Sequence, residues 1–232
     1  MDTKNFNELE EIINIKFKDL DFLKNALIHR SYLNEHHDFP MEHNERLEFL
    51  GDAVLELVTT EFLYNNYPNS EGELTNWRAS LVNSKMLAKV ARRLNFEKYL
   101  YLSKGEAKDK NEKARNYILA NTTEAVIGAI YLDGGWDNAK QFIDEFILTE
   151  LPDILENKLY IDPKSRFQEI SQEKIGVTPT YEVHSESGPD HDKIFIIGVY
   201  IGEEMIAEGE GGSKQEAQVS AAGKAIKIKK WD

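Results

Sequence analysis

Residues 44–55 read NERLEFLGDAVL, and this stretch decides the first half of the fold. Its apolar side chains recur at helical spacing, and Leu47, Leu50, Val54 and Leu57 occupy neighbouring positions on one side of a helix. We therefore expect a helix that these four side chains anchor to a core.

The same stretch carries three carboxylates, Glu45, Glu48 and Asp52, at positions i, i+3 and i+7. On a helix this spacing places them within an arc of about 60°. Like charges so close repel one another, and a bound cation such as Mg²⁺ would compensate them. The spacing alone also fits a solvated acidic face, so both interpretations stay open.

A second acidic position lies in residues 118–129, which read ILANTTEAVIGA. Asn121 and Glu124 are three residues apart and share a face of this otherwise apolar helix. A carboxylate there is costly unless it is paired or bound to a metal. Glu124 is thus either a hydrogen-bonded core residue or a metal ligand.

Composition bounds the chemistry. The chain has 232 residues and no cysteine, which excludes disulfides, thiolate zinc sites and cysteine nucleophiles and leaves oxygen and imidazole as metal ligands. The net charge of −13 argues against a nucleic-acid partner, because phosphate binding normally leaves a basic surface. The N-terminus has no leader-like apolar segment, and no apolar run approaches the ~20 residues that span a bilayer. We expect a cytoplasmic protein without a membrane partner.

The pattern changes along the chain. Residues 6–155 show helical periodicity, interrupted by a polar stretch at 104–115 that is a loop or a solvated helix, with structure resuming at Tyr117. A linker is expected at 158–162. Beyond it the pattern predicts a helix, three strands and a helix, over 163–174, 180–185, 193–201, 205–209 and from Ser213. The expected fold is multidomain, with an all-α domain followed by a small α+β domain of α-β-β-β-α order.

Residues 42–55 closely resemble the signature of ribonuclease III. Other motifs of that family follow its order, at residues 26–32, 71–74, 78–82 and 118–133. The C-terminal segment is similar to a double-stranded RNA-binding domain, with matching points at residues 167–169, 188–191 and 212–214. The resemblance implies a catalytic domain over 1–157, a linker over 158–162 and an RNA-binding domain over 163–232.

By this resemblance the chain is an endoribonuclease that hydrolyses double-stranded RNA and processes ribosomal RNA precursors and other structured transcripts. It would leave 5′-phosphate and 3′-hydroxyl ends with two-nucleotide 3′ overhangs. The implied cofactor is Mg²⁺, with Mn²⁺ able to substitute, and no small-molecule cofactor is implied. The implied catalytic residues are Asp52 and Glu124, the implied metal ligands are Glu48, Asp52, Asn121 and Glu124, and the supporting acids are Glu45 and Glu71.

Asn121 departs from the family, which usually has aspartate at this position. An amide oxygen remains available, but one negative charge is lost. The alternative function is therefore a double-stranded RNA-binding protein whose cleavage is weakened or lost.

The resemblance also implies partners. Phe49 matches a position at the family's dimer interface, so a homodimer with two sites is expected, although a lone helical Phe could also pack in a core. The RNA-binding positions are Gln168, His191, Ser213 and Lys214. Ser213 and Glu216 form a predicted capping box, which would leave N–H groups at the helix N-terminus for phosphate and so answer the objection from net charge.

Overall fold

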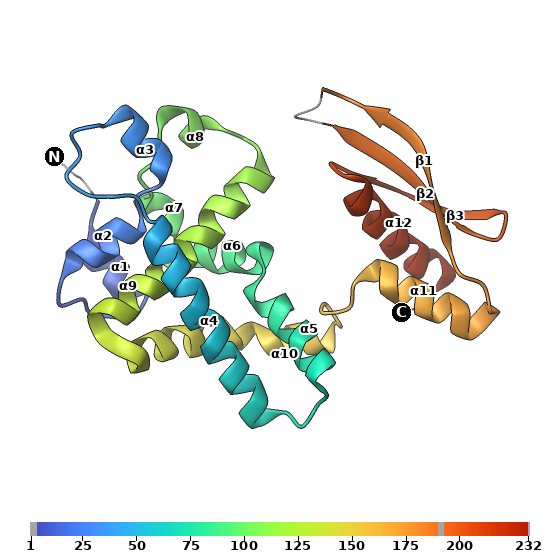
Figure 1. The fold of residues 1–232 in the computed structure, drawn as a ribbon, viewed down its shortest axis with the longest axis horizontal. Helices are drawn as coiled ribbons and strands as arrows, with labels where there is room; N and C mark the ends of the chain where they lie inside the picture. Colours follow the sequence, from blue (N-terminus) through green and yellow to red (C-terminus); the bar gives the residue numbers. More distant parts are fainter. Residues whose placement is uncertain (1–3, 190–192, 232) are drawn as a thin grey trace. The chain divides into compact units, whose positions relative to one another are not determined.

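The computed structural model describes residues 4–189 and 193–231. The chain divides into two compact units with the bounds Met1–Tyr160 and Ile161–Asp232 (Figure 1). The first unit is all-helical, and the second contains a helix, a three-stranded antiparallel sheet and a final helix. The predicted fold class is confirmed. Among the described residues, no helix is both long enough and apolar enough to cross a membrane.

The helices of the first unit follow one another with short connections. They are α1 Phe6–Ile12, α2 Leu20–Ala26, α3 Arg30–Glu35, α4 Glu45–Asn66, α5 Glu71–Val82, α6 Ser84–Arg93, α7 Phe96–Tyr99, α8 Lys104–Lys108, α9 Glu112–Phe146, the short 3₁₀ helix η1 Leu148–Glu150, and α10 Leu151–Glu156.

The long helices α4 and α9 pack against each other at the centre of this unit (Figure 1). Leu47 and Val54 of α4 are buried in the core, and Leu50 packs against it. The expectation for Leu57 was wrong, because its side chain is 58% exposed. At 100° per residue Leu57 lies about 80° around the helix from Leu47, beyond the arc that α9 covers.

The start of α4 is held by Asn44, which is buried. Its side-chain amide donates to the carbonyl of Ala26 (3.0 Å), and its backbone N–H donates to the carbonyl of Ile28 (2.9 Å). Asn44 thereby ties the acidic end of α4 to the segment between α2 and α3.

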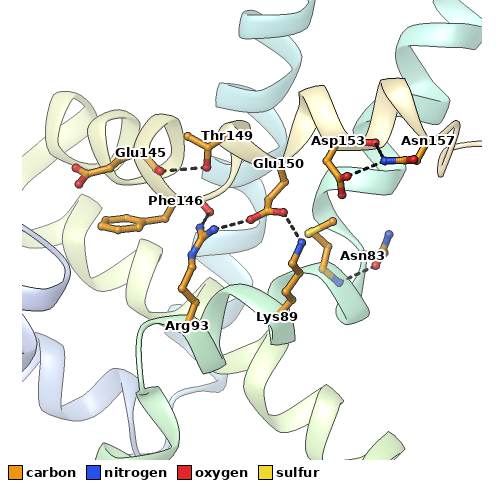
Figure 2. Close-up of polar contacts among 10 residues, drawn as sticks. Asn83, Lys89, Arg93, Glu145, Phe146, Thr149, Glu150, Asp153 and Asn157 are labelled. Atoms are coloured by element: carbon orange, nitrogen blue, oxygen red, sulfur yellow. Dashed lines mark hydrogen bonds and ion pairs between the residues drawn. The ribbon is translucent and has the colours of Figure 1, made fainter.

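A buried carboxylate joins α6 to the chain after α9 (Figure 2). Glu150 is 6% exposed, and its two oxygens accept from Lys89 Nζ (2.6 Å) and Arg93 Nη1 (2.5 Å). Both basic residues lie on α6, so the carboxylate is paired twice, as burial of a charge requires. This contact holds α6 to η1.

The polar stretch at 104–115 is mostly helical. It contains α8 and the first turn of α9, which begins at Glu112 rather than near Tyr117, because the side chain of Asn111 accepts from the backbone N–H of Ala114 and caps the helix. Of the two interpretations of this stretch, a loop or a solvated helix, the helix is the better description. Further along, α9 is kinked at Gly135, whose φ is 80°.

The second unit consists of α11 Pro163–Ile175, β1 Thr180–Ser187, β2 Ile194–Ile201, β3 Glu204–Gly211 and α12 Lys214–Lys229. The strands are ordered β1-β2-β3, and α12 packs on β2 and β3. A Cβ on Gly209 would lie 2.1 Å from the backbone nitrogen of Ala221, so glycine is what lets α12 approach β3. Phe167, Val199 and Ile226 form the core of this unit.

Candidate active site

Two glycines bring α4 and α9 into backbone contact. A Cβ on Gly51 would lie 1.7 Å from the carbonyl oxygen of Glu124, and a Cβ on Gly128 would lie 2.2 Å from the carbonyl oxygen of Leu47. No side chain fits at either position. The close approach places Glu48 and Asp52, on either side of Gly51, next to the turn of α9 that carries Glu124.

The electrostatics of Glu124 report this proximity. Burial, followed by the negative charges of Asp52 and Glu48, raises the pKa of its carboxyl from 4.5 to about 8. Asp52 itself is exposed. One end of the cluster is therefore open to solvent, while the other end lies partly buried between the helices.

Glu48 lies between the two helices as well. Burial raises the pKa of Glu48, and the charges of Glu45 and Asp52 act in the same direction. A hydrogen bond with the side chain of Asn121 lowers it. Because a carboxylate only accepts, the Asn121 amide N–H is the donor and its carbonyl oxygen remains available as a ligand.

The donor set of this cluster is made of oxygen, which suits a hard divalent cation. Crowded, partly buried carboxylates are costly without a counter-charge, and a cation would relieve the repulsion at Glu48 and Glu124. Within residues 4–189 and 193–231, no three Asp, Glu or His side chains stand close enough together to form a ready-made metal cage. The oxygen donors thus suit a hard cation in kind, and the side chains would have to rearrange to surround one.

The structure brings Glu45, Glu48, Asp52, Asn121 and Glu124 to one end of the α4–α9 contact. Glu45 is exposed at the start of α4, where its carboxylate lies 3.6 Å from Nη1 of Arg30. Glu71 is not part of this group. It lies in the first turn of α5 and lines a separate cavity of about 810 Å³ at the far end of α4.

Phe49 is 82% exposed, so it does not pack in the core of this chain. Leu57 and Tyr64, at 58% and 78% exposure, follow it along the same side of α4. At 100° per residue these three side chains fall within an arc of about 80°, separate from the acidic side of the helix. Together they form an exposed apolar stripe, defined here as Phe49, Leu57 and Tyr64.

In the second unit, Gln168 is exposed on α11 and Lys214 opens α12. Ser213 caps α12, since its Oγ accepts from the backbone N–H of Glu216 (3.2 Å). The carboxylate of Glu216 accepts from the N–H of Gly212 (3.0 Å), one residue earlier than the predicted capping box requires. His191 lies outside the described residues.

Gly51 and Gly128 lie within the sequence motifs, but their packing role was not predicted from the sequence. The available signal was energetic, because glycine inside a helix costs roughly 1 kcal/mol relative to alanine. Two such glycines beside acidic residues indicate a close approach of another backbone.

Comparisons with known proteins match a family to each unit. Residues 19–151 match the family described as ribonuclease-III-like, and residues 163–229 match the double-stranded RNA binding motif. The protein named Ribonuclease 3 from Desulfotalea psychrophila is 46% identical over 221 residues, which cover 95% of this chain and 91% of that protein. Ribonuclease 3 from Carboxydothermus hydrogenoformans is 44% identical over 233 residues, covering 99% and 98%.

Among solved structures, the nuclease domain of ribonuclease III from Campylobacter jejuni is similar to this chain. It is 38% identical, with a TM-score of 0.56, and the match covers 64% of this chain and 99% of that domain. That structure was described for flexibility in a region involved in dimer formation of the domain.

Proposed function

The chain belongs to the ribonuclease III family, and we propose that its double-stranded RNA endonuclease activity resides at the α4–α9 contact. The carrying observation is one arrangement: carboxylates from two helices meet where Gly51 and Gly128 allow backbone contact. The expected products have 5′-phosphate and 3′-hydroxyl ends with two-nucleotide 3′ overhangs, as is standard for the family, whose substrates include ribosomal RNA precursors and other structured transcripts.

The family depends on a divalent metal, and we propose Mg²⁺, replaceable by Mn²⁺, for this chain. Glu48, Asp52, Glu124 and the amide oxygen of Asn121 would hold it. When bound, the metal supplies Lewis-acid activation of water and neutralises charge on the departing 3′ oxygen. The role of the protein residues is to bind the metal and to orient the RNA. The partly buried Glu124 and the exposed Asp52 lie on opposite helices and would flank the phosphate that is attacked.

Glu45 and Glu71 are proposed as supporting acids with different positions. Glu45 lies beside Glu48 at the start of α4, where Arg30 and His43 are its neighbours. Glu71 would support the binding of RNA or of the second protomer of a dimer, because the cavity that it lines lies away from Glu124.

The binding-only alternative rested on Asn121. In the structure the Asn121 amide supports Glu48 by a hydrogen bond. It therefore has a positive role in the cluster while it retains a carbonyl oxygen for metal. This arrangement favours the enzyme.

Double-stranded RNA binding follows from the motif matched at residues 163–229. We propose that Gln168 and His191 contact the minor groove. Ser213 and Lys214 would meet phosphate at the start of α12. Domains of this kind recognise A-form shape through placed contacts, so a net acidic chain can bind RNA. The proposed domain limits remain 1–157 and 163–232, joined by 158–162.

The nuclease domain is proposed to act as a homodimer, consistent with the dimer formation described for the Campylobacter jejuni domain. The exposed apolar stripe of α4, which begins at Phe49, is the proposed contact. Each protomer would contribute one site, and each site would cut one strand.

The test is cleavage of a long RNA duplex by the purified chain with Mg²⁺. The native chain should cut it to short duplexes, and Glu124→Gln should bind it with similar affinity while cutting at least a hundredfold more slowly. If the native chain bound the duplex without cutting it, the proposed endonuclease activity would be wrong. If Glu124→Gln cut at the normal rate, the proposed location of the active site would be wrong.

A further inference from the structure

A small pocket adjoins the carboxylate cluster on the side away from Glu124. It has a volume of about 290 Å³ and lies between the start of α3, the start of α4 and the second turn of α9. Its lining includes Glu48 and Asn121, so it shares a wall with the proposed metal site. His29, Arg30 and Tyr117 also line it.

His29 is held in place by its backbone. Its N–H donates to the carbonyl of Tyr101 (3.1 Å), and the N–H of Tyr101 donates to the carbonyl of Leu27 (2.9 Å). These bonds flank a parallel bridge between Ile28 and Tyr101. The backbone at His29 is therefore held by a segment that is distant in sequence.

The hydrogen-bond partners of the His29 ring favour one tautomer. The backbone N–H of Ser31 donates to Nδ1 (3.3 Å), so Nδ1 carries a lone pair and no proton. Ser31 Oγ accepts from the N–H of Ser103 (3.1 Å) and lies 2.8 Å from Nδ1, so with Nδ1 unprotonated its hydroxyl is the donor. Burial lowers the pKa of His29, which favours the neutral ring. A neutral ring without a proton on Nδ1 carries it on Nε2.

The Nε2–H group thus becomes a donor with a fixed direction. No acceptor for it is present among the residues that the structure describes, and the ring borders the pocket. Arg30, whose side chain is 71% exposed, adds a second donor. The pocket is therefore lined by the donors of His29 and Arg30 and by the carboxylates of Glu45 and Glu48, with Nη1 of Arg30 3.6 Å from Glu45. A sugar-phosphate backbone, rich in acceptor oxygens, suits the donor of His29.

We propose that His29 is a substrate-positioning residue, whose Nε2–H donates to a phosphate or ribose oxygen of the RNA strand next to the bond that is cut. The proposal rests on the proposed function and names a contact of that site. Bound there, the strand would be fixed beside Glu48 and Asn121, so the scissile phosphate would be directed toward Asp52 and Glu124.

Two substitutions separate this role from helix capping. Asparagine at position 29 can still accept from the N–H of Ser31, as Asn is a good N-cap, but it lacks the donor at the Nε2 position. Glutamine places an amide donor close to Nε2 but loses the cap. Positioning predicts that His29→Gln is the more active of the two, whereas a structural role predicts the reverse.

The experiment measures kcat/KM for duplex cleavage, thermal unfolding and the Mg²⁺ concentration for half-maximal rate. His29→Asn should lower kcat/KM by about tenfold to a hundredfold, the value of one hydrogen bond to a charged or buried partner, with unfolding and Mg²⁺ dependence unchanged. His29→Gln should recover severalfold, and His37→Asn, on an exposed loop residue, should match the native chain. Native rates in His29→Asn, or a slower His29→Gln, would overturn the proposal.

A duplex with one 2′-deoxy nucleotide beside the cleavage site distinguishes the two acceptors. The penalty of His29→Asn should disappear on that duplex if the acceptor is the 2′-hydroxyl, and persist if it is phosphate. If the native chain binds but does not cut, the proposed function fails separately. The contact is then judged by duplex affinity, which His29→Asn should lower by about tenfold, and unchanged affinity would overturn it.

Discussion

The side chain of Asn121 connects the two helices of the site. Its amide N–H meets the Glu48 carboxylate, and its carbonyl oxygen is left for a cation. An aspartate here would add a negative charge beside Glu48 and remove the donor. Compared with aspartate, Asn121 therefore attracts a metal ion less strongly, but it leaves less charge repulsion in the cluster when no metal is bound.

This exchange predicts the behaviour of Asn121→Asp. With one more anionic ligand, the Mg²⁺ concentration for half-maximal cleavage should fall by about threefold to tenfold. Without metal, the free energy of unfolding at pH 8 should fall by about 1 kcal/mol, because like charges are crowded. Cleavage rates across a Mg²⁺ series and urea unfolding in EDTA measure the two effects. A variant that needs more Mg²⁺ than the native chain would contradict the assignment of position 121 as a ligand.

Glu124 predicts a pH dependence of stability in the metal-free protein. Its pKa is raised from 4.5 to about 8 by burial and by Asp52 and Glu48. Between these values the folded chain keeps a proton that the unfolded chain has lost. The stabilising contribution is thus complete below pH 4.5 and disappears as pH rises through 8.

Urea unfolding in EDTA from pH 5 to pH 9 should show this decline in the native chain. Glu124→Gln should decline less, and at pH 9 it should be more stable than the native chain by about 1 to 3 kcal/mol. Added Mg²⁺ should restore stability to the native chain at high pH. Equal pH profiles for the two proteins would contradict the burial of a strained carboxylate here.

Helix α4 has an acidic side, a buried apolar side and an exposed apolar side. Residue spacing alone distinguished only the acidic side from the apolar side. The acidic side and part of the apolar side followed from spacing, as did the all-helical unit and the α-β-β-β-α order. Leu57 was assigned to the core because any apolar residue near the arc looks alike in a sequence. Its exposure becomes visible only when α9 is in place. The pocket at His29 was missed for the same reason, since it joins segments that lie far apart in the chain.

Gly51 predicts how strongly the contact of α4 with α9 depends on a missing side chain. Gly51→Ala puts a methyl group 1.7 Å from the Glu124 carbonyl oxygen, so the helices must separate. Overpacking of this severity should cost about 3 kcal/mol in unfolding free energy, and cleavage should fall at least a hundredfold because Asp52 and Glu124 move apart.

Gly72→Ala is the matched control in helix α5. A Cβ there meets nothing within 4 Å, so the same substitution should stabilise by up to about 1 kcal/mol through helix propensity and leave cleavage unchanged. Chemical denaturation and initial cleavage rates test both variants. Similar effects of the two alanines would mean that the backbone contact is not what assembles the site.

The complete enzyme must act on two strands, and one chain supplies one carboxylate cluster. A homodimer that pairs the stripe of Phe49, Leu57 and Tyr64 with its copy would present two clusters related by a twofold axis. In such an interface every substituted residue occurs twice. The cost of removing one apolar side chain is therefore doubled in the dimer.

Phe49→Ser makes the last prediction. Burial of a phenylalanine side chain contributes about 1.5 to 3 kcal/mol, so loss of two at the interface should raise the dimer dissociation constant by a hundredfold or more. Sedimentation equilibrium measures this change, and Leu132→Ser, which removes a 50% exposed side chain from α9, is the control. The monomer should keep a folded single site, so long duplexes should be nicked in one strand before short products with overhangs appear. Dimers that persist in Phe49→Ser but dissociate in Leu132→Ser would place the interface on another face of the nuclease unit.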